Sequence, residues 1–231
     1  MTRPLSPPDC ARAIGLALLL AGTACTSGLG QLQTARTVPK GEVRHSISGG
    51  YDANSIERDG PPWLGNFIVQ YAARIGAAEH VDVGVKVFLG LGGLVDAKVQ
   101  VVDGPRLALS LLGGAGGAFD AESGAGVVHV PAMLLGSYHV ARWFSPYVGA
   151  GYGAFWIFNY ASTQDVPPGS TAAPRAWHGD GLLMLHAGFE LGSPGRPAFL
   201  LEYGYLRPIV SDPGDHYAFA TNHLFLGGIR F

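Results

Sequence analysis

Histidine and carboxylate side chains are grouped at two places in the C-terminal third of the chain, where they could perform acid–base chemistry. His186 and Glu190 lie four residues apart, and Glu202 falls in the next apolar segment. Residues four apart share a face of an extended strand, so we expect His186 and Glu190 side by side. A histidine beside a carboxylate can act as a general base that the carboxylate orients. A second group, in a polar stretch, consists of Asp212, Asp215 and His216.

The sequence supplies neither a nucleophile nor a metal-ligand pattern to accompany these groups. It contains no Gly-x-Ser-x-Gly elbow. Residues 212–215, Asp-Pro-Gly-Asp, are residue types that first of all favour a turn. His178 with Asp180, like the residues around His216, lacks the spacing of known metal sites. The glycine runs at 113–117 lack the Lys-Ser/Thr of a phosphate loop and favour close backbone approach in a strand. We therefore expect no enzyme, no metal and no cofactor.

Composition favours a β-rich architecture. Only 14% of the 231 residues are charged, 48% are hydrophobic, and 35 are glycine. This charge content is well below the roughly 25% of soluble domains, and glycine at this frequency disfavours a helical bundle. Apart from the N-terminal leader, no run of 18 apolar residues occurs, so no spanning helix is expected. A net charge of -2 argues against a nucleic-acid partner.

From residue 41 onward the chain alternates between period-two segments and turn signals, which predicts strands. Most segments have the roughly 9–11 residues that a tilted strand needs to cross a bilayer. Their number is even, as it is in single-chain bacterial barrels. The ten predicted strands are 41–51, 66–76, 81–89, 93–102, 106–117, 126–139, 146–158, 181–192, 198–207 and 220–231.

The connections between these segments alternate in length. Short ones follow the even-numbered strands, at 77–80, 103–105, 142–145 and 193–197. Long ones follow odd-numbered strands, at 52–65, 159–180 and 208–219, although the turn near 90–93 on that side is tight. Short turns on one side and long loops on the other are typical of outer-membrane barrels, with both termini on the periplasmic side. The loop 159–180 would then face outside the cell, where it could bind a ligand.

The two faces of the predicted strands differ in polarity. In the segment 81–89 the valines at 81, 83, 85 and 87 share one face, while Asp82 and Lys86 lie on the other. A soluble barrel would turn the apolar face inward, whereas a membrane barrel turns it toward lipid. The mixed signs and glycines of the charged face favour a crowded lumen with paired ions. The predicted lumen network consists of Arg44, Arg74, Asp82, Lys86, Asp96, Lys98, His186, Glu190, Glu202 and Arg230, with Gln70, Gln100 and Arg106 nearby.

Aromatic residues near the ends of the segments would form interfacial girdles around such a barrel. The candidates are Trp63, Tyr138, Trp143, Tyr147, Trp156, Phe158 and Tyr205.

The N-terminus has the pattern of an export signal. Arg3 and Arg12 precede the short apolar run 13–21, and small residues follow. Cleavage after Ala24 would remove Cys10 and leave Cys25 as the only cysteine, so no intramolecular disulfide could form. Ala24-Cys25 resembles a bacterial lipobox, in which the cysteine receives a diacylglycerol, although Gly22 stands where that motif usually has Leu. The expected organisation is a signal peptide at 1–24, a tether at 25–40 and a barrel domain at 41–231.

Two stretches carry a resemblance to a known family. The final segment, A-T-N-H-L-F-L-G-G-I-R-F, ends on Phe231 with apolar residues at alternate positions before it, and it resembles the C-terminal strand of bacterial outer-membrane β-barrels. Residues 33–41, Q-T-A-R-T-V-P-K-G, resemble the lead-in of predicted proteobacterial outer-membrane lipoproteins with barrel domains. The resemblance implies insertion through barrel-assembly machinery that recognises the C-terminal strand. It carries no common catalytic motif.

Together these features predict an all-β, transmembrane, antiparallel up-and-down barrel of about ten strands in the outer membrane. The expected role is structural or that of a narrow pore, with lipid anchoring at Cys25 and outer-membrane lipid as the surrounding partner. Two alternatives stay open. One is a barrel enzyme that acts on lipid or peptide, and the other is a soluble periplasmic lipocalin-like binding barrel.

Overall fold

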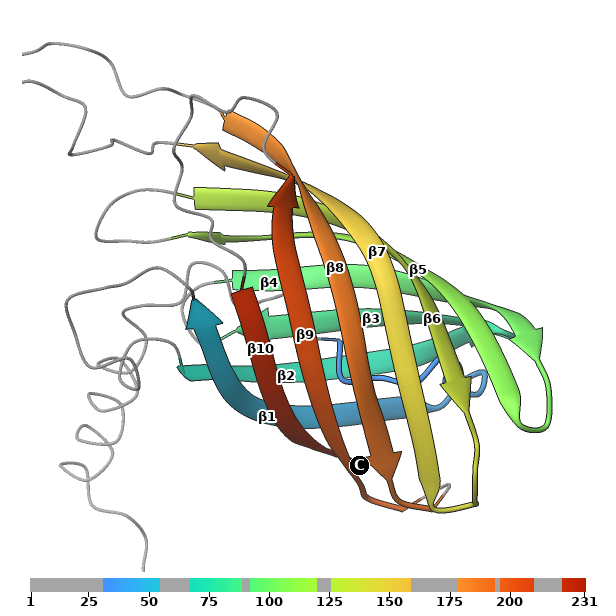
Figure 1. Cartoon of the computed structure of the whole chain (residues 1–231). Coiled ribbons are helices and arrows are strands. Elements are labelled where there is room, and N and C mark those ends of the chain that lie inside the picture. Colours follow the sequence, from blue (N-terminus) through green and yellow to red (C-terminus); the bar gives the residue numbers. More distant parts are fainter. Residues whose placement is uncertain are drawn as a thin grey trace, which may run out of the picture.

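A computed structural model describes residues 31–54, 67–88, 92–119, 126–158, 178–193, 196–209 and 222–231. These residues form ten long strands that curve around a common axis (Figure 1). The strands are β1 (Val43–Asn54), β2 (Phe67–Ala78), β3 (Val81–Phe88), β4 (Gly92–Asp103), β5 (Leu107–Phe119), β6 (Gly126–Tyr138), β7 (Phe144–Phe158), β8 (His178–Leu191), β9 (Ala198–Ile209) and β10 (Asn222–Arg230). Every predicted strand is present, and the bounds differ by only a few residues.

The sheet closes on itself into an antiparallel barrel, which confirms the predicted fold. Each strand pairs with its neighbours in sequence, and β1 pairs with β10 from Ser46–Arg230 to Asn54–Asn222. The closing seam ends with two backbone hydrogen bonds of 2.9 Å between His45 and Phe231. Closure leaves no strand edge unpaired, and backbone groups in lipid cannot be satisfied in any other way by a sheet.

The outer wall of the barrel is apolar. Val85, Val95 and Leu111 are 47%, 55% and 53% exposed, whereas Asp82, Lys86 and Asp96 on the alternate positions are buried. This orientation is the reverse of a soluble barrel and contradicts the lipocalin-like alternative. Among the residues that the structure describes, no helix is long and apolar enough to cross a membrane.

Most of the predicted girdle residues that the structure describes face outward, but one does not. Tyr138, Trp143 and Trp156 are exposed at the barrel surface, and Tyr205 is half-buried. Tyr147 is buried, so its assignment to a girdle was wrong. It occupies an inward position of β7, where its hydroxyl can reach a lumen carboxylate. Trp63 and the side chain of Phe158 lie outside the described residues.

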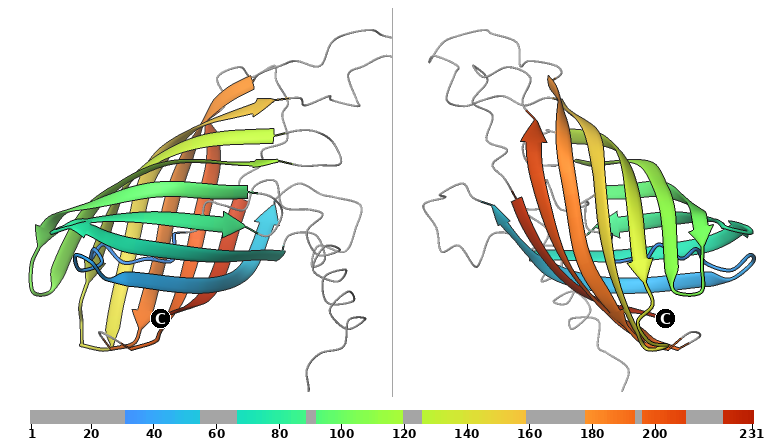
Figure 2. Two further views of the ribbon diagram at one scale, coloured as in Figure 1. Left: turned by 180° about the vertical axis from the view of Figure 1, so that it is seen from behind. Right: turned by 45° about the vertical axis from the view of Figure 1, so that its right-hand side comes forward.

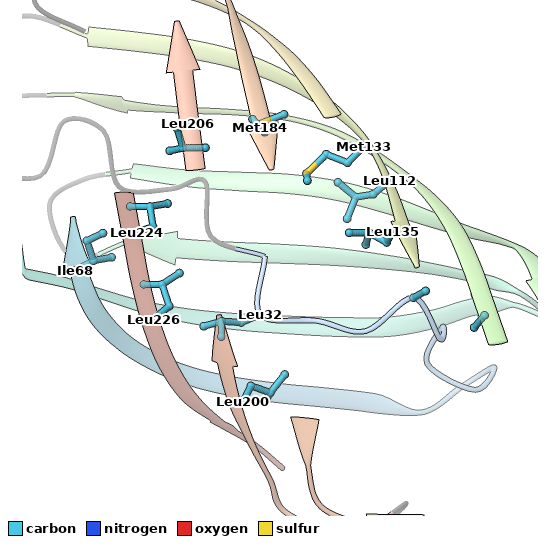
Figure 3. Close-up of a cluster of buried hydrophobic side chains, with 12 residues drawn as sticks. Leu32, Ile68, Leu112, Met133, Leu135, Met184, Leu200, Leu206, Leu224 and Leu226 are labelled. Atoms are coloured by element: carbon cyan, nitrogen blue, oxygen red, sulfur yellow. The ribbon is translucent and has the colours of Figure 1, made fainter. Parts of the chain in front are cut away.

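The inner wall is layered rather than uniformly polar. Besides the charged side chains it carries a cluster of buried apolar ones, most of which are labelled in Figure 3. We expected charge, glycine and small residues on this face, and in this part of the lumen that expectation was wrong. The cluster comprises Leu32, Ala35, Ile68, Ala108, Leu112, Met133, Leu135, Met184, Leu200, Leu206, Leu224 and Leu226.

Residues 31–38, which we call the luminal segment, run inside the barrel. In Figures 1 and 2 this blue trace lies within the ring of strands. Gln31, Leu32, Gln33, Thr34, Ala35 and Val38 are buried. The chain leaves the lumen at the barrel end that carries the short turns, called the turn end below, where Lys40 bridges to Gly76 of β2. A Cβ on Gly76 would lie 2.0 Å from the Pro39 carbonyl oxygen, so only glycine allows this exit.

Candidate functional site

A buried ion cluster on β2, β3 and β4 forms the centre of the lumen network. Arg74 donates to Asp82 at 2.9 Å from Nε and to Asp96 at 2.5 Å from Nη1. The Lys98 ammonium lies 3.4 Å from the second oxygen of Asp82. The side chains of both aspartates are fully buried, and Arg74 keeps only 11% exposure. Buried charges need paired, hydrogen-bonded partners, and this cluster supplies them.

The strand register brings these groups together. Asp82 is the direct partner of Lys98 across β3 and β4, and Gly84 is the partner of both Arg74 and Asp96. A Cβ on Gly84 would lie 2.5 Å from Arg74 Nη1. The absence of a side chain there gives the guanidinium room to reach two carboxylates.

The ion cluster also holds the luminal segment. Lys98 donates to the carbonyl oxygens of Thr34 at 3.0 Å and Arg36 at 2.8 Å, and the Val38 amide donates to Asp82 at 2.8 Å. These side-chain bonds satisfy backbone groups of the luminal segment that a neighbouring strand would otherwise pair with. Further bonds come from Gln100, whose Oε1 accepts from the Thr37 amide at 3.0 Å, and from Ser110, which donates to the Ala35 carbonyl oxygen.

Glu202 on β9 holds the other end of the segment. Its two oxygens accept the amides of Gln31 and Leu32, each at 2.7 Å. The same carboxylate lies 3.1 Å from His186 Nδ1 and accepts from the Tyr147 hydroxyl at 3.1 Å. The His186 and Glu202 side chains have no exposed surface. Glu202 therefore acts as a buried clamp on the backbone, with four hydrogen-bonding neighbours.

At the turn end, Arg36 fixes the segment to the loops. Its guanidinium donates to His139 Nε2 at 2.5 Å and to the Gly104 carbonyl oxygen at 3.0 Å. His139 Nδ1 lies 2.5 Å from the Ser145 hydroxyl. Burial and, after it, the positive charge of Arg36 lower the pKa of His139. The neutral imidazole is the form that can accept from Arg36.

The remaining predicted lumen residues lie on β1, β3, β8 and β10. Arg230 makes a bidentate pair with Glu190 at 2.5 and 2.7 Å. Arg44 lies 3.7 Å from the exposed Glu42 carboxylate. The side chain of Lys86 is buried on β3 and its ammonium donates to Gln31 Oε1 at 3.2 Å.

The predicted acid–base group does not form as the sequence suggested. His186 pairs with Glu202, whereas Glu190 pairs with Arg230. The His186 and Glu202 side chains have no exposed surface among the described residues, and Glu202 is bonded to the luminal segment. Arg106, expected in the lumen, is exposed because the turn before β5 includes it. Asp212, Asp215, His216, Cys25 and the side chains of His178 and Asp180 lie outside the described residues.

Sequence reasoning missed the luminal segment, which it treated only as a tether. The signal available was composition, because Gln31, Gln33, Thr34 and Thr37 can hydrogen-bond lumen groups without adding charge. Within the described part of the chain, no group of three His, Cys, Asp or Glu side chains could hold a metal ion.

Closure, an even strand number, an apolar outer wall and an ion-paired lumen together define a transmembrane β-barrel. Single-chain barrels of this construction belong to the bacterial outer membrane, and that is the location of this chain.

Comparison with known proteins adds similarities of shape only. No protein family and no curated protein matches the chain. Among solved structures, it is similar to the outer-membrane protease OmpT of Escherichia coli at 11% identity and a TM-score of 0.49, over 86% of this chain and 99% of that one. It is similar to the translocator domain of the autotransporter NalP of Neisseria meningitidis at 12% identity and a TM-score of 0.46, over 96% and 95%. The NanC porin matches at 8% identity and a TM-score of 0.42, over 81% and 98%.

Proposed function

We propose that this protein is a non-conducting outer-membrane barrel whose own luminal segment closes it and whose role is structural. The observation that carries the proposal is the row of hydrogen bonds from Glu202, Lys98, Gln100 and Asp82 to the backbone of residues 31–38. A chain that merely passed through a pore would not use buried charged groups as fixed acceptors and donors. Insertion would proceed through β10, which ends beside Phe231.

Thiol accessibility tests the closed lumen directly. In a Cys10→Ser, Cys25→Ala background, Thr34→Cys places a single reactive thiol in the chain at a position that is 5% exposed. We expect a membrane-impermeant maleimide to label it at least about 100-fold more slowly than Glu79→Cys, which lies in an exposed turn. Labelling of the two thiols at similar rates, or discrete single-channel conductance from the unmodified protein, would contradict the proposal.

Lipid attachment at Cys25 is the second part of the proposed function. It is supported by the Ala24-Cys25 sequence after an apolar leader and by the loss of every other cysteine on cleavage. Three acyl chains, or a diacylglycerol alone, would add an anchor besides the barrel.

Intact mass of the membrane-extracted protein measures this modification. We expect the chain to start at residue 25 with added diacylglycerol mass, and a Cys25→Ser variant to lose that mass. Cys10→Ser is the matched control, because Cys10 lies in the leader and its replacement leaves the mature protein unchanged. A mature mass without lipid would refute the anchor and leave the closed barrel untouched.

A further inference from the structure

A cavity of about 40 Å³ lies between the luminal segment and the strands near the turn end. Six cationic side chains line it, and none of the described residues around it is Asp or Glu. The cations are Arg36, Arg44, Arg74, Lys86, Lys98 and Arg230. We propose that this cavity binds a phosphate group. The inference depends on where the luminal segment lies and not on lipid attachment or on the lack of conductance.

The strand register places like charges together in this wall. Arg44 and Arg74 are direct partners across β1 and β2. Arg230 on β10 is the direct partner of Ser46, two residues along from Arg44. Like charges directly opposite one another in a sheet destabilise it. An anion between the guanidinium groups converts that repulsion into attraction.

The charge balance of the described lumen points the same way. The six cations of the cavity face four lumen carboxylates, Asp82, Asp96, Glu190 and Glu202. Asp82, Asp96 and Glu190 pair with Arg74, Lys98 and Arg230, whereas Glu202 contacts His186 and the luminal segment. The exposed Glu42 is the only carboxylate among the described ion pairs of Arg44. With Glu42 counted, the formal charges of the six cations exceed those of the five carboxylates by one, which favours an anionic ligand.

Size and access also suit this ligand class. One water needs roughly 10–15 Å³ of such space, so the cavity has room for about three waters or one tetrahedral oxyanion. Arginine guanidinium groups bind phosphate oxygens in a bidentate manner. Arg44 and Arg230 keep 29% and 18% of their side-chain surface exposed at the turn end, which gives a ligand a way in. Free phosphate and a lipid phosphate headgroup share this chemistry.

Thermal unfolding of the full mature protein in phosphatidylcholine vesicles tests the site, with inorganic phosphate as the probe and potassium chloride at matched ionic strength. Phosphate will raise the unfolding midpoint of the unmodified protein, and Arg44→Gln will weaken its apparent affinity at least about tenfold. Without phosphate, Arg44→Gln will unfold at the same or a higher temperature, because the repulsion between Arg44 and Arg230 is gone. The unmodified protein should thus have the higher unfolding midpoint with phosphate but not without it. A purely structural role of Arg44 would not produce this change.

Arg106→Gln is the matched control, since Arg106 is exposed in the neighbouring turn and does not line the cavity. It should respond to phosphate as the unmodified protein does. Vesicles that contain phosphatidic acid distinguish a lipid phosphate headgroup from free phosphate as the ligand. Stabilisation in these vesicles without added phosphate identifies the headgroup, and no stabilisation there identifies the free ion. Equal stabilisation of Arg44→Gln by phosphate, or an equal effect of chloride, would overturn the proposal.

Discussion

Replacing Asp82 by alanine is expected to lower the free energy of unfolding of the barrel by about 3–5 kcal/mol. Asp82 has no exposed side-chain surface, and its two oxygens serve Arg74, Lys98 and the Val38 amide. The substitution leaves two buried cations with Asp96 as their remaining carboxylate in this cluster. It also removes one attachment of the luminal segment. Equilibrium urea unfolding in phospholipid vesicles, followed by heat-modifiable gel mobility, measures the loss.

Glu79→Ala is the control, because it removes a carboxylate from an exposed turn. Asp103 would not serve, because its Oδ1 accepts from Gln100 Nε2 at 2.8 Å and Gln100 holds the luminal segment. A change within about 0.5 kcal/mol is expected for Glu79→Ala. If the two variants lose equal stability, the buried cluster does not support the barrel as argued. Asp82→Asn should fall between them, since it keeps the shape and one acceptor but loses the charge.

The outer wall could be predicted from the sequence because it depends on a local property. Side chains of a strand alternate between two faces, so the positions of Val85 and Val87 relative to Lys86 follow from residue order alone. Which face meets lipid followed from the sorting of the loops and from the mixed charges and glycines of the other face. Strand bounds followed from the same alternation.

The contents of the lumen could not be predicted in this way. Whether Glu190 meets His186 or Arg230 depends on the register of three strands, because β9 lies between β8 and β10. Tyr147 has the residue type of a girdle aromatic, and only the position of Glu202 shows why it points inward. The luminal segment carries no periodic pattern, because its backbone partners are side chains of distant strands rather than a neighbouring strand.

The apolar inner cluster has a related explanation. Leu200 and Leu206 share the inward face of β9 with Glu202, so a charged residue does not make its whole face polar. Leu32 of the luminal segment belongs to the same cluster as Leu200. The lumen is therefore a packed core in which the segment contributes both apolar and hydrogen-bonding groups. That arrangement explains why one part of the inner wall is apolar and another is charged.

Placing an arginine on the outer wall distinguishes a lipid-facing surface from a water-facing one. Leu111 and Leu107 lie on the same face of β5, with exposures of 53% and 45%, and Leu107 is the first residue of the strand. In a bilayer, Leu111→Arg should cost about 2–4 kcal/mol, while Leu107→Arg at the interface should cost about 0–1 kcal/mol. Unfolding in urea from vesicles gives both values.

In water neither substitution should matter, because a charge on an exposed strand position usually changes stability by less than about 0.5 kcal/mol. The informative quantity is thus the difference between two identical substitutions four residues apart on one strand face. A difference of about 2 kcal/mol or more can arise only if Leu111 lies deeper in a medium of low polarity than Leu107. Equal and small costs would mean that the apolar wall does not face lipid at this strand, whatever the closure of the sheet.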